Sequence, residues 1–344
     1  MDALKTEILA ALKRFEVPGA IISIRSKKYG NLEIFYGYSD VERRIKMRDS
    51  KELPWKIGSI TKSFTGTMIL QMLDEGKVDL DRSIDRYLMG IPNGQNITLR
   101  QVGNMRSGIY NYSESDRFAA LNATQPHRVW SPSELLAMGI TQPPYFPPGT
   151  DIHYSNTNSV ILGLVIERLN PVNGSPGSFE KELYKRMIDP LKLRNTSFSA
   201  VIEEPCIHGY LPNGDGTYTD ITDYNDTWGW SAGQMISDLP DLHRYLRLSV
   251  AKHITISDYA AEQQRDWASE MTRDGVTVSY GFQMEKIGDY YIGHNGSLPG
   301  YSNYGMVNEK TRTTVVVMCN IQNTTDGVNP SDYITEQLIT RALP

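Results

Sequence analysis

The sequence predicts an α/β fold of the α+β type, in which both ends of the chain build one antiparallel sheet and a helical region is inserted between them. Short apolar segments typical of strands cluster near the two ends of the 344-residue chain. Between them, apolar residues recur three or four positions apart, which is typical of helices. We therefore expect a sheet domain from residues 1–58 and 225–344 and a mainly helical domain from residues 59–224.

The strands of the predicted sheet are bounded by polar links. Residues 19–25 and 32–38 should pair as a hairpin across the link 27–31. Further strands are expected at residues 290–293, 301–307 and 313–319. Both terminal segments, 1–15 and 330–342, have helical periodicity. We expect these two helices to flank the sheet.

The helices between the two ends are also predicted by periodicity, with supporting signals at some of their ends. They are expected at residues 62–75, 159–169, 179–188 and 238–248. Another should begin at Ser131, because Pro132 and Glu134 follow it in the order of a capping box. Residues 206–224 are rich in Gly, Asp, Thr and Tyr, and we expect them to form an excursion over the surface.

Composition excludes several classes of function. The net charge is −5 and no basic run occurs, so nucleic-acid binding is not expected. No apolar run is long enough to cross a membrane. Residues 1–15 resemble an amphipathic helix rather than a signal peptide. If Met1 is the natural start, this predicts a cytoplasmic protein, although a secreted protein trimmed of its signal would look similar.

No cofactor or metal is expected from the sequence. Cys206 and Cys319 lie far apart, and separated cysteines are more often buried thiols than a bridge or a metal pair. No C-x-x-C or H-E-x-x-H pattern occurs. The sequence does not indicate an oligomeric state.

The strongest chemical signal is Ser59 followed by Lys62 at the start of a predicted helix. Residues three apart share a helix face, so the lysine amine should lie beside the serine hydroxyl. A serine is a weak nucleophile until a neighbouring base takes its proton, and Lys62 could act as that base or tune one. Ser178 and Lys181 have the same spacing, and we interpret them as an ordinary surface helix start.

Two later motifs distinguish Ser59 from a simple helix-capping serine. Tyr154 begins a Tyr-Ser-Asn motif that includes Asn156, and His294 begins a His-Asn-Gly motif. Tyr154 could shuttle a proton between the nucleophile and the leaving group. Asn156 could orient Lys62 or a substrate amide oxygen. A second Tyr-Ser-Asn at 301–303 follows the His-Asn-Gly motif and is therefore out of order.

The remaining candidates should bind substrate. Strand glycines such as Gly296 often mark the close approach of a ligand or another backbone, and Asn295 lies beside it. The backbone N–H groups of Ser59 and Ser297 are expected to form an oxyanion hole. Trp228 could form an apolar wall of the pocket or be a core residue, and we weight the two alternatives equally.

Taken together, these residues resemble the penicillin-recognising serine hydrolases, and the likeness spans nearly the whole chain. This family includes an actinomycete D,D-carboxypeptidase, D-aminopeptidases, D-amino-acid amidases, class C β-lactamases and related esterases. The matching segments are residues 56–59, 74–81, 97–101, 107–109, 148–158, 231–233 and 293–297. The resemblance implies a β-lactamase/transpeptidase-like fold and an acyl-enzyme at Ser59, released by water or by an amine.

Two departures from the family pattern bear on the substrate. The carboxypeptidases carry Thr where this chain has Asn295. Near the position of their carboxylate-binding Arg, this chain has Glu285, which would repel a carboxylate and attract an amine. We therefore expect an amidase, esterase or transacylase acting on a small-molecule amide or ester, with water or an amine as acceptor.

Other functions stay open at this point. A D,D-carboxypeptidase or β-lactamase would use the same motifs. A catalytically silent relative that binds a ligand is a further alternative of a different class. The intact set of Ser59, Lys62, Tyr154, Asn156 and His294 argues against that loss of activity.

Overall fold

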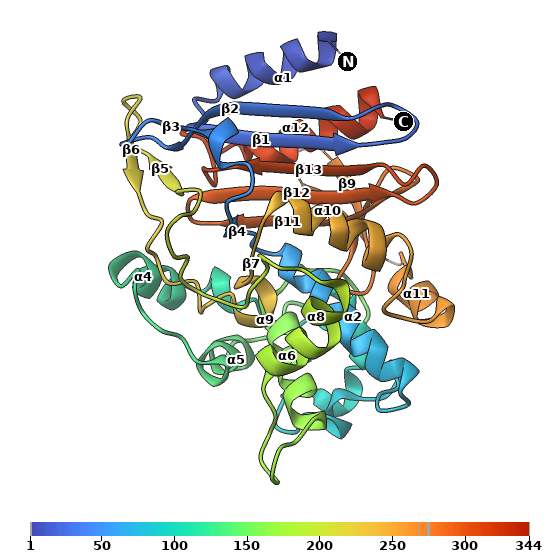
Figure 1. Cartoon of the computed structure of the whole chain (residues 1–344). Helices are drawn as coiled ribbons and strands as arrows, with labels where there is room; N and C mark the ends of the chain where they lie inside the picture. The colour runs from blue at the N-terminus through green and yellow to red at the C-terminus, as the bar shows by residue number, and fades with distance from the viewer. Residues whose placement is uncertain (1, 268, 274–275, 344) are drawn as a thin grey trace.

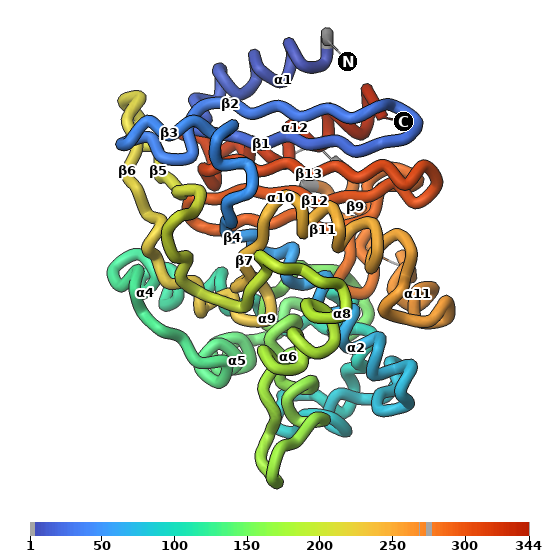
Figure 2. The backbone as a smooth tube through the Cα atoms, in the orientation of Figure 1, coloured from blue at the N-terminus to red at the C-terminus, as the bar shows by residue number. Residues whose placement is uncertain are grey.

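A nine-stranded antiparallel sheet dominates the computed structural model, which describes residues 2–267, 269–273 and 276–343 (Figure 1). The strand order is β3-β2-β1-β13-β12-β11-β10-β9-β8, so the first and last parts of the chain meet at the β1–β13 pair. This confirms the predicted fold class. Figure 2 shows both termini on the sheet side of the molecule.

The main sheet contains β1 (Gly19–Arg25), β2 (Leu32–Asp40), β3 (Ile45–Lys46), β8 (Ser269–Arg273), β9 (Val276–Tyr280), β10 (Glu285–Ile287), β11 (Tyr291–Leu298), β12 (Tyr301–Asn308) and β13 (Thr314–Cys319). Two small sheets pair β4 (Trp55–Lys56) with β7 (Ile236–Ser237), and β5 (Tyr210–Pro212) with β6 (Tyr218–Asp220).

The α-helices are α1 (Asp2–Arg14), α2 (Ile60–Asp74), α3 (Leu99–Gly103), α4 (Asp116–Thr124), α5 (Pro132–Ile140), α6 (Asn156–Leu169), α7 (Phe179–Leu183), α8 (Asp189–Leu191), α9 (Trp230–Gly233), α10 (Leu239–Tyr245), α11 (Asp258–Gln264) and α12 (Pro330–Gln337). Short 3-10 turns are η1 (Met47–Ser50), η2 (Ile84–Arg86), η3 (Gly94–Asn96) and η4 (Tyr112–Glu114). π-Helical turns η5 (Tyr184–Ile188), η6 (Leu246–Val250) and η7 (Leu338–Ala342) extend α7, α10 and α12.

The central strands separate two hydrophobic cores because successive side chains point to opposite faces. Ile22 and Val317 face a core shared with α1 and α12. Ile21 and Val316 face the other core, which includes α2 and α10. The two terminal helices therefore cover one face of the sheet, as predicted.

Helix α2 lies in the middle of the second core, between the sheet and the other helices. It contacts β11 on one side and α6, α9 and α11 on others. Twelve of its fifteen residues are buried, Lys62 among them. Burying a charged side chain in such a helix has a high free-energy cost. A lysine at this position therefore indicates a chemical role.

Several predicted elements differ from the structure in their bounds. Helix α6 begins at Asn156 rather than residue 159, which places Asn156 in its first turn. Strand β11 extends to Leu298, so the whole His-Asn-Gly-Ser segment is strand. Residues 206–224 form the β5–β6 hairpin and also bury Ile207 and Tyr210, so this segment is not entirely a surface excursion.

Strands β8, β9 and β10 were not predicted. They are short, and β8 carries few apolar residues.

Both cysteines are free and buried, in agreement with the expectation. Within the described residues, no helix combines the length and apolar character needed to cross a bilayer. The proposed division into two domains remains a prediction.

Candidate active site

Ser59 and Lys62 lie together at the start of α2, as the sequence predicts. Ser59 is the residue before the helix, and its side chain makes no capping hydrogen bond. Instead, Lys62 Nζ donates to Ser59 Oγ at 2.9 Å. The amine also donates to the carbonyl oxygen of Ala232, on α9, at 2.7 Å. Two acceptors therefore fix the amine beside the hydroxyl.

Burial sets the charge state of this amine. Lys62 is fully buried, whereas Ser59 is partly exposed. Burial lowers the pKa of Lys62 well below its ordinary value, and the nearby negative charge of Glu285 opposes that shift. A lowered pKa favours the neutral amine, which is the form that can accept a proton.

Tyr154, in the loop before α6, and His294, on β11, complete the cluster. The Tyr154 ring centroid lies 4.9 Å from Lys62 Nζ and 6.2 Å from the His294 ring. Tyr280, on β9, has its hydroxyl 3.0 Å from His294 Nε2 and packs edge-on against Tyr154. The structure therefore brings Ser59, Lys62, Tyr154 and His294 together.

Two glycines allow the start of α2 to approach β11 closely. Gly58 has φ of +56°, and a Cβ there would lie 2.8 Å from Ser297 N. A Cβ at Gly296 would lie 2.0 Å from the Ile57 carbonyl oxygen and 3.2 Å from Ser59 N. The backbone amides of Ser59 and Ser297 consequently lie on neighbouring segments, as an oxyanion hole requires.

Replacing Gly58 by alanine should disrupt this contact. We expect Gly58→Ala to lower kcat by about a hundredfold, the scale of losing one oxyanion donor. The matched control is Gly288→Ala, because Gly288 has nearly the same φ, +58°, with no atom within 4 Å of the added Cβ. Steady-state kinetics of both variants tests this. Equal losses would attribute the effect to backbone strain rather than to the hole.

Asn156 is held by a short loop rather than by Lys62. Its side-chain nitrogen donates to Ser113 Oγ at 2.9 Å, and its backbone N–H donates to Asn111 Oδ1 at 3.0 Å. In the described part of the chain, neither acceptor of Lys62 is Asn156. The predicted role of orienting Lys62 directly is therefore not supported, whereas contact with a substrate amide remains a prediction.

Glu285 was expected to contact a substrate amine, but the structure does not place its carboxylate at an exposed position. Its carboxylate is fully buried at the start of β10. Tyr304 donates to Oε2 at 2.8 Å and the Asn295 backbone N–H donates to the same oxygen at 3.3 Å. To meet a substrate amine directly, the carboxylate would have to leave these donors. In the structure it acts on Lys62 through its charge instead.

The other predicted binding residues differ in how far their side chains are exposed to solvent. Asn295 is buried, and its side chain lies 3.4 Å from both carboxylate oxygens of Asp332. Ser297 Oγ accepts from Gln322 at 3.1 Å. Trp228 is partly exposed and packs edge-on against Phe118. Its interpretation as a pocket wall remains a prediction.

Sequence reasoning missed some residues that shape the site. The Ala232 carbonyl could not be recognised because any residue supplies one. Tyr280 could have been found, since residues 276–280 alternate as Val-Thr-Val-Ser-Tyr in the manner of a strand. Asn111 and Ser113 gave no signal because they act through a loop packed against α6.

A separate apolar cavity of about 520 Å³ lies beside this loop. Its lining includes Ile109, Tyr110 and Phe146, and contains none of the predicted site residues. This apolar cavity is thus distinct from the Ser59 cluster.

Residues 10–338 match the protein family described as Beta-lactamase. Protein flp of Staphylococcus aureus (strain COL) is 24% identical over 320 residues, covering 91% of this chain. The match covers 61% of that relative, so the chain spans about three fifths of its length.

Solved structures resemble the whole chain. A D-stereospecific amidohydrolase from Streptomyces sp. superposes with a TM-score of 0.83 at 28% identity, covering 97% of both chains. D-amino acid amidase from Ochrobactrum anthropi SV3, complexed with D-phenylalanine, superposes with a TM-score of 0.80 at 20% identity. That match covers 98% of this chain and 97% of the amidase and concerns the fold.

Proposed function

Because the chain belongs to the beta-lactamase family of serine hydrolases, we propose that it is an acyl-transfer enzyme that forms an acyl-enzyme at Ser59. The donor is an amide or ester of a small metabolite or peptide, and the acyl group passes to water or to an amine. The observation that carries this proposal is the 2.9 Å hydrogen bond between the fully buried Lys62 amine and the partly exposed Ser59 hydroxyl.

In the acylation step, Ser59 Oγ attacks the carbonyl carbon of the donor. Neutral Lys62, assisted by Tyr154, takes the hydroxyl proton as the new C–O bond forms. The negative charge that develops on the carbonyl oxygen is bound by the backbone N–H groups of Ser59 and Ser297. The C–N or C–O bond to the leaving group then breaks, and the leaving group receives the proton.

Release of the acyl group repeats these steps with a different nucleophile. Water or an amine gives its proton to the Lys62–Tyr154 pair while it attacks the ester carbonyl carbon. The bond to Ser59 Oγ breaks and the serine recovers the proton. His294 lies against Tyr154 and is hydrogen-bonded to Tyr280, so we assign it to holding the phenol in place.

An amide of a D-amino acid is the donor class that we favour. Its support is the 28% identity over nearly the full length to a protein described as a D-stereospecific amidohydrolase. The D,D-carboxypeptidase and β-lactamase alternatives share the Ser59 chemistry. A panel of D- and L-aminoacyl amides, simple esters and β-lactams, each with and without added amine, identifies both donor and acceptor.

Acylation of Ser59 can be observed directly. We expect incubation with an activated ester or a β-lactam, quenched early in the reaction, to add one acyl mass to the intact protein, because the proposed cycle passes through an ester at Ser59. Ser59→Ala should give no adduct. Intact-protein mass spectrometry makes the measurement. If no donor gives an adduct, or if the adduct persists in Ser59→Ala, the nucleophile is not Ser59.

A further inference from the structure

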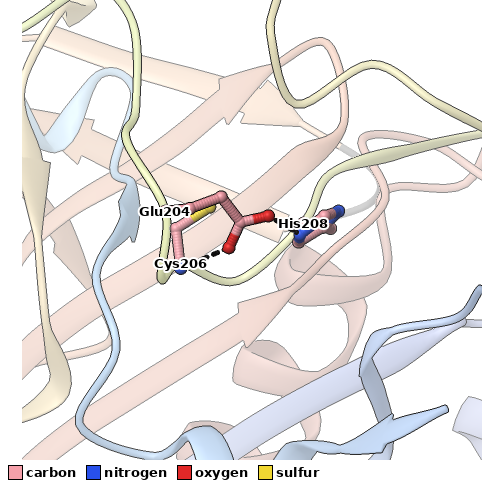
Figure 3. Close-up of side chains that lie close together, drawn as sticks. All are labelled: Glu204, Cys206 and His208. Atoms are coloured by element: carbon pink, nitrogen blue, oxygen red, sulfur yellow. Dashed lines mark hydrogen bonds and ion pairs between the residues drawn. The ribbon is translucent and has the colours of Figure 1, made fainter. Parts of the chain in front are cut away.

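Three side chains with different ligand atoms converge outside the Ser59 cluster. Glu204, Cys206 and His208 lie on one loop, and one ligand atom from each lies within 4.8 Å of the others. Figure 3 shows the Glu204 carboxylate turned toward the His208 ring. Cys206 lies between these two residues in the sequence. Cys206 is buried and Glu204 is exposed, so the group is open to solvent on one side.

The two ring nitrogens of His208 face different carboxylates. Nε2 lies 2.7 Å from Glu204 Oε1, and Nδ1 lies 2.5 Å from Asp220 Oδ2. Histidines that bind metals almost always donate their second ring N–H to a carboxylate, which fixes the tautomer and ring orientation. Asp220 occupies that supporting position, which leaves Nε2 directed at the carboxylate of Glu204.

A fourth group, from β2, points at the same nitrogen. Asp40 Oδ2 lies 3.8 Å from His208 Nε2, and the Asp40 side chain is only 3% exposed. In the described residues this oxygen has no hydrogen-bond partner, although Arg43 Nη1 lies 3.4 Å from it. A buried carboxylate oxygen without a hydrogen bond is costly, and a bound cation would remove that cost.

We propose that Glu204, Cys206 and His208 bind a divalent transition-metal ion of the Zn²⁺ type, and that Asp40, which lies outside this three-residue group but 3.8 Å from His208 Nε2, moves in as the fourth ligand. One sulfur, one nitrogen and two carboxylate oxygens match the ligand preferences of Zn²⁺ and its four-coordinate structural sites. Ligand atoms around such an ion are roughly 3.2–3.8 Å apart, so the side chains of Glu204, Cys206 and His208 would close in by about 1 Å and that of Asp40 would move farther. The ion replaces the thiol proton and any proton on Nε2, and these protons are released on binding.

The ion would have a structural role because the loop is tied to the strand that precedes Ser59. The Ile207 backbone N–H donates to the Pro54 carbonyl oxygen at 3.0 Å, next to β4. Tyr301, at the start of β12, donates to the Ile207 carbonyl oxygen at 2.9 Å. A metal on this loop would therefore stabilise the folded chain without touching the Ser59 cluster, and the site is independent of the proposed acyl transfer.

Metal titration of the full chain tests the site. The protein is treated with a chelator and desalted, then titrated with Zn²⁺ by calorimetry and with Co²⁺ by absorption. We expect one equivalent to bind, with a thiolate-to-Co²⁺ charge-transfer band in the ultraviolet. Saturating Zn²⁺ should raise Tm, and chelation should lower it without changing the initial rate of Ser59 acylation.

Variants separate this site from adventitious binding. Cys206→Ser should remove the charge-transfer band and weaken Zn²⁺ binding at least tenfold, and Glu204→Gln should weaken binding by a similar factor. The matched control is Cys319→Ser, which changes the other buried free thiol and should leave binding unchanged. If Cys206→Ser does not fold, Glu204→Gln decides, because its side chain is 51% exposed. Absence of stoichiometric binding, or binding unaffected by Glu204→Gln, would overturn the proposal.

Discussion

Replacing Lys62 by alanine is expected to lower kcat/KM by a hundredfold or more, the scale of lost acid–base assistance. The reason is that Lys62 Nζ is hydrogen-bonded to the nucleophile at 2.9 Å and is fully buried. Lys62→Met should lose activity to the same degree, because it fills the same volume but cannot accept a proton. Steady-state kinetics with an activated ester measures both variants.

The matched control for Lys62 is Lys181→Ala. Ser178 and Lys181 repeat the Ser-x-x-Lys spacing, but Ser178 caps α7 and Lys181 is exposed. This control should keep kcat/KM within about twofold of the parent. Substitutions of exposed residues outside the active site and the core usually have small effects. Near-full activity in Lys62→Ala would remove Lys62 from the mechanism and transfer the role of base to Tyr154.

The lowered pKa of Lys62 also predicts how activity and stability depend on pH. The amine can act as a base only above its own pKa, so kcat/KM should fall as the pH is lowered through that value. In the unfolded chain, a lysine binds its proton up to about pH 10.4. Between the two pKa values the unfolded state binds more protons, so the free energy of unfolding should rise with pH. Lys62→Met should lose this contribution to the slope.

Much of the fold could be predicted because the strongest sequence patterns coincide with its central elements. The strand at 19–25 was predicted with the bounds that β1 has, and both terminal helices were recognised. The β8–β10 extension was missed because its strands are three to five residues long, and the alternation in β9 is too short to be decisive beside the more polar β8 and β10. Their pairing is set by neighbours in the sheet, which local periodicity does not report.

The chemical cluster was predictable for a different reason. Ser59, Lys62, Tyr154 and His294 lie in motifs whose order along the chain is informative, so distant segments could be associated without coordinates. Burial was not predictable in the same way. Glu285 was expected to face a substrate, yet it lies between Tyr304 and the Asn295 backbone. The sequence position of a charge says little about which donors surround it in the fold.

Tyr154→Phe is expected to lower kcat/KM by a hundredfold or more with little change in stability. Phenylalanine keeps the ring that lies 4.9 Å from Lys62 Nζ and packs against Tyr280, and it removes only the hydroxyl. The loss therefore reports proton transfer by the phenol rather than packing. Kinetics and thermal unfolding of the same preparation separate the two effects.

The second Tyr-Ser-Asn sequence supplies the control for this prediction. Tyr301→Phe also removes one hydroxyl, which donates to the Ile207 carbonyl oxygen, and should cost about 1 kcal/mol of stability with kcat/KM nearly unchanged. The two variants should therefore show opposite patterns, one losing rate and the other stability. If Tyr154→Phe keeps near-full activity, Lys62 must carry the proton in both directions, because no other part of the proposed cycle moves it between the nucleophile and the leaving group.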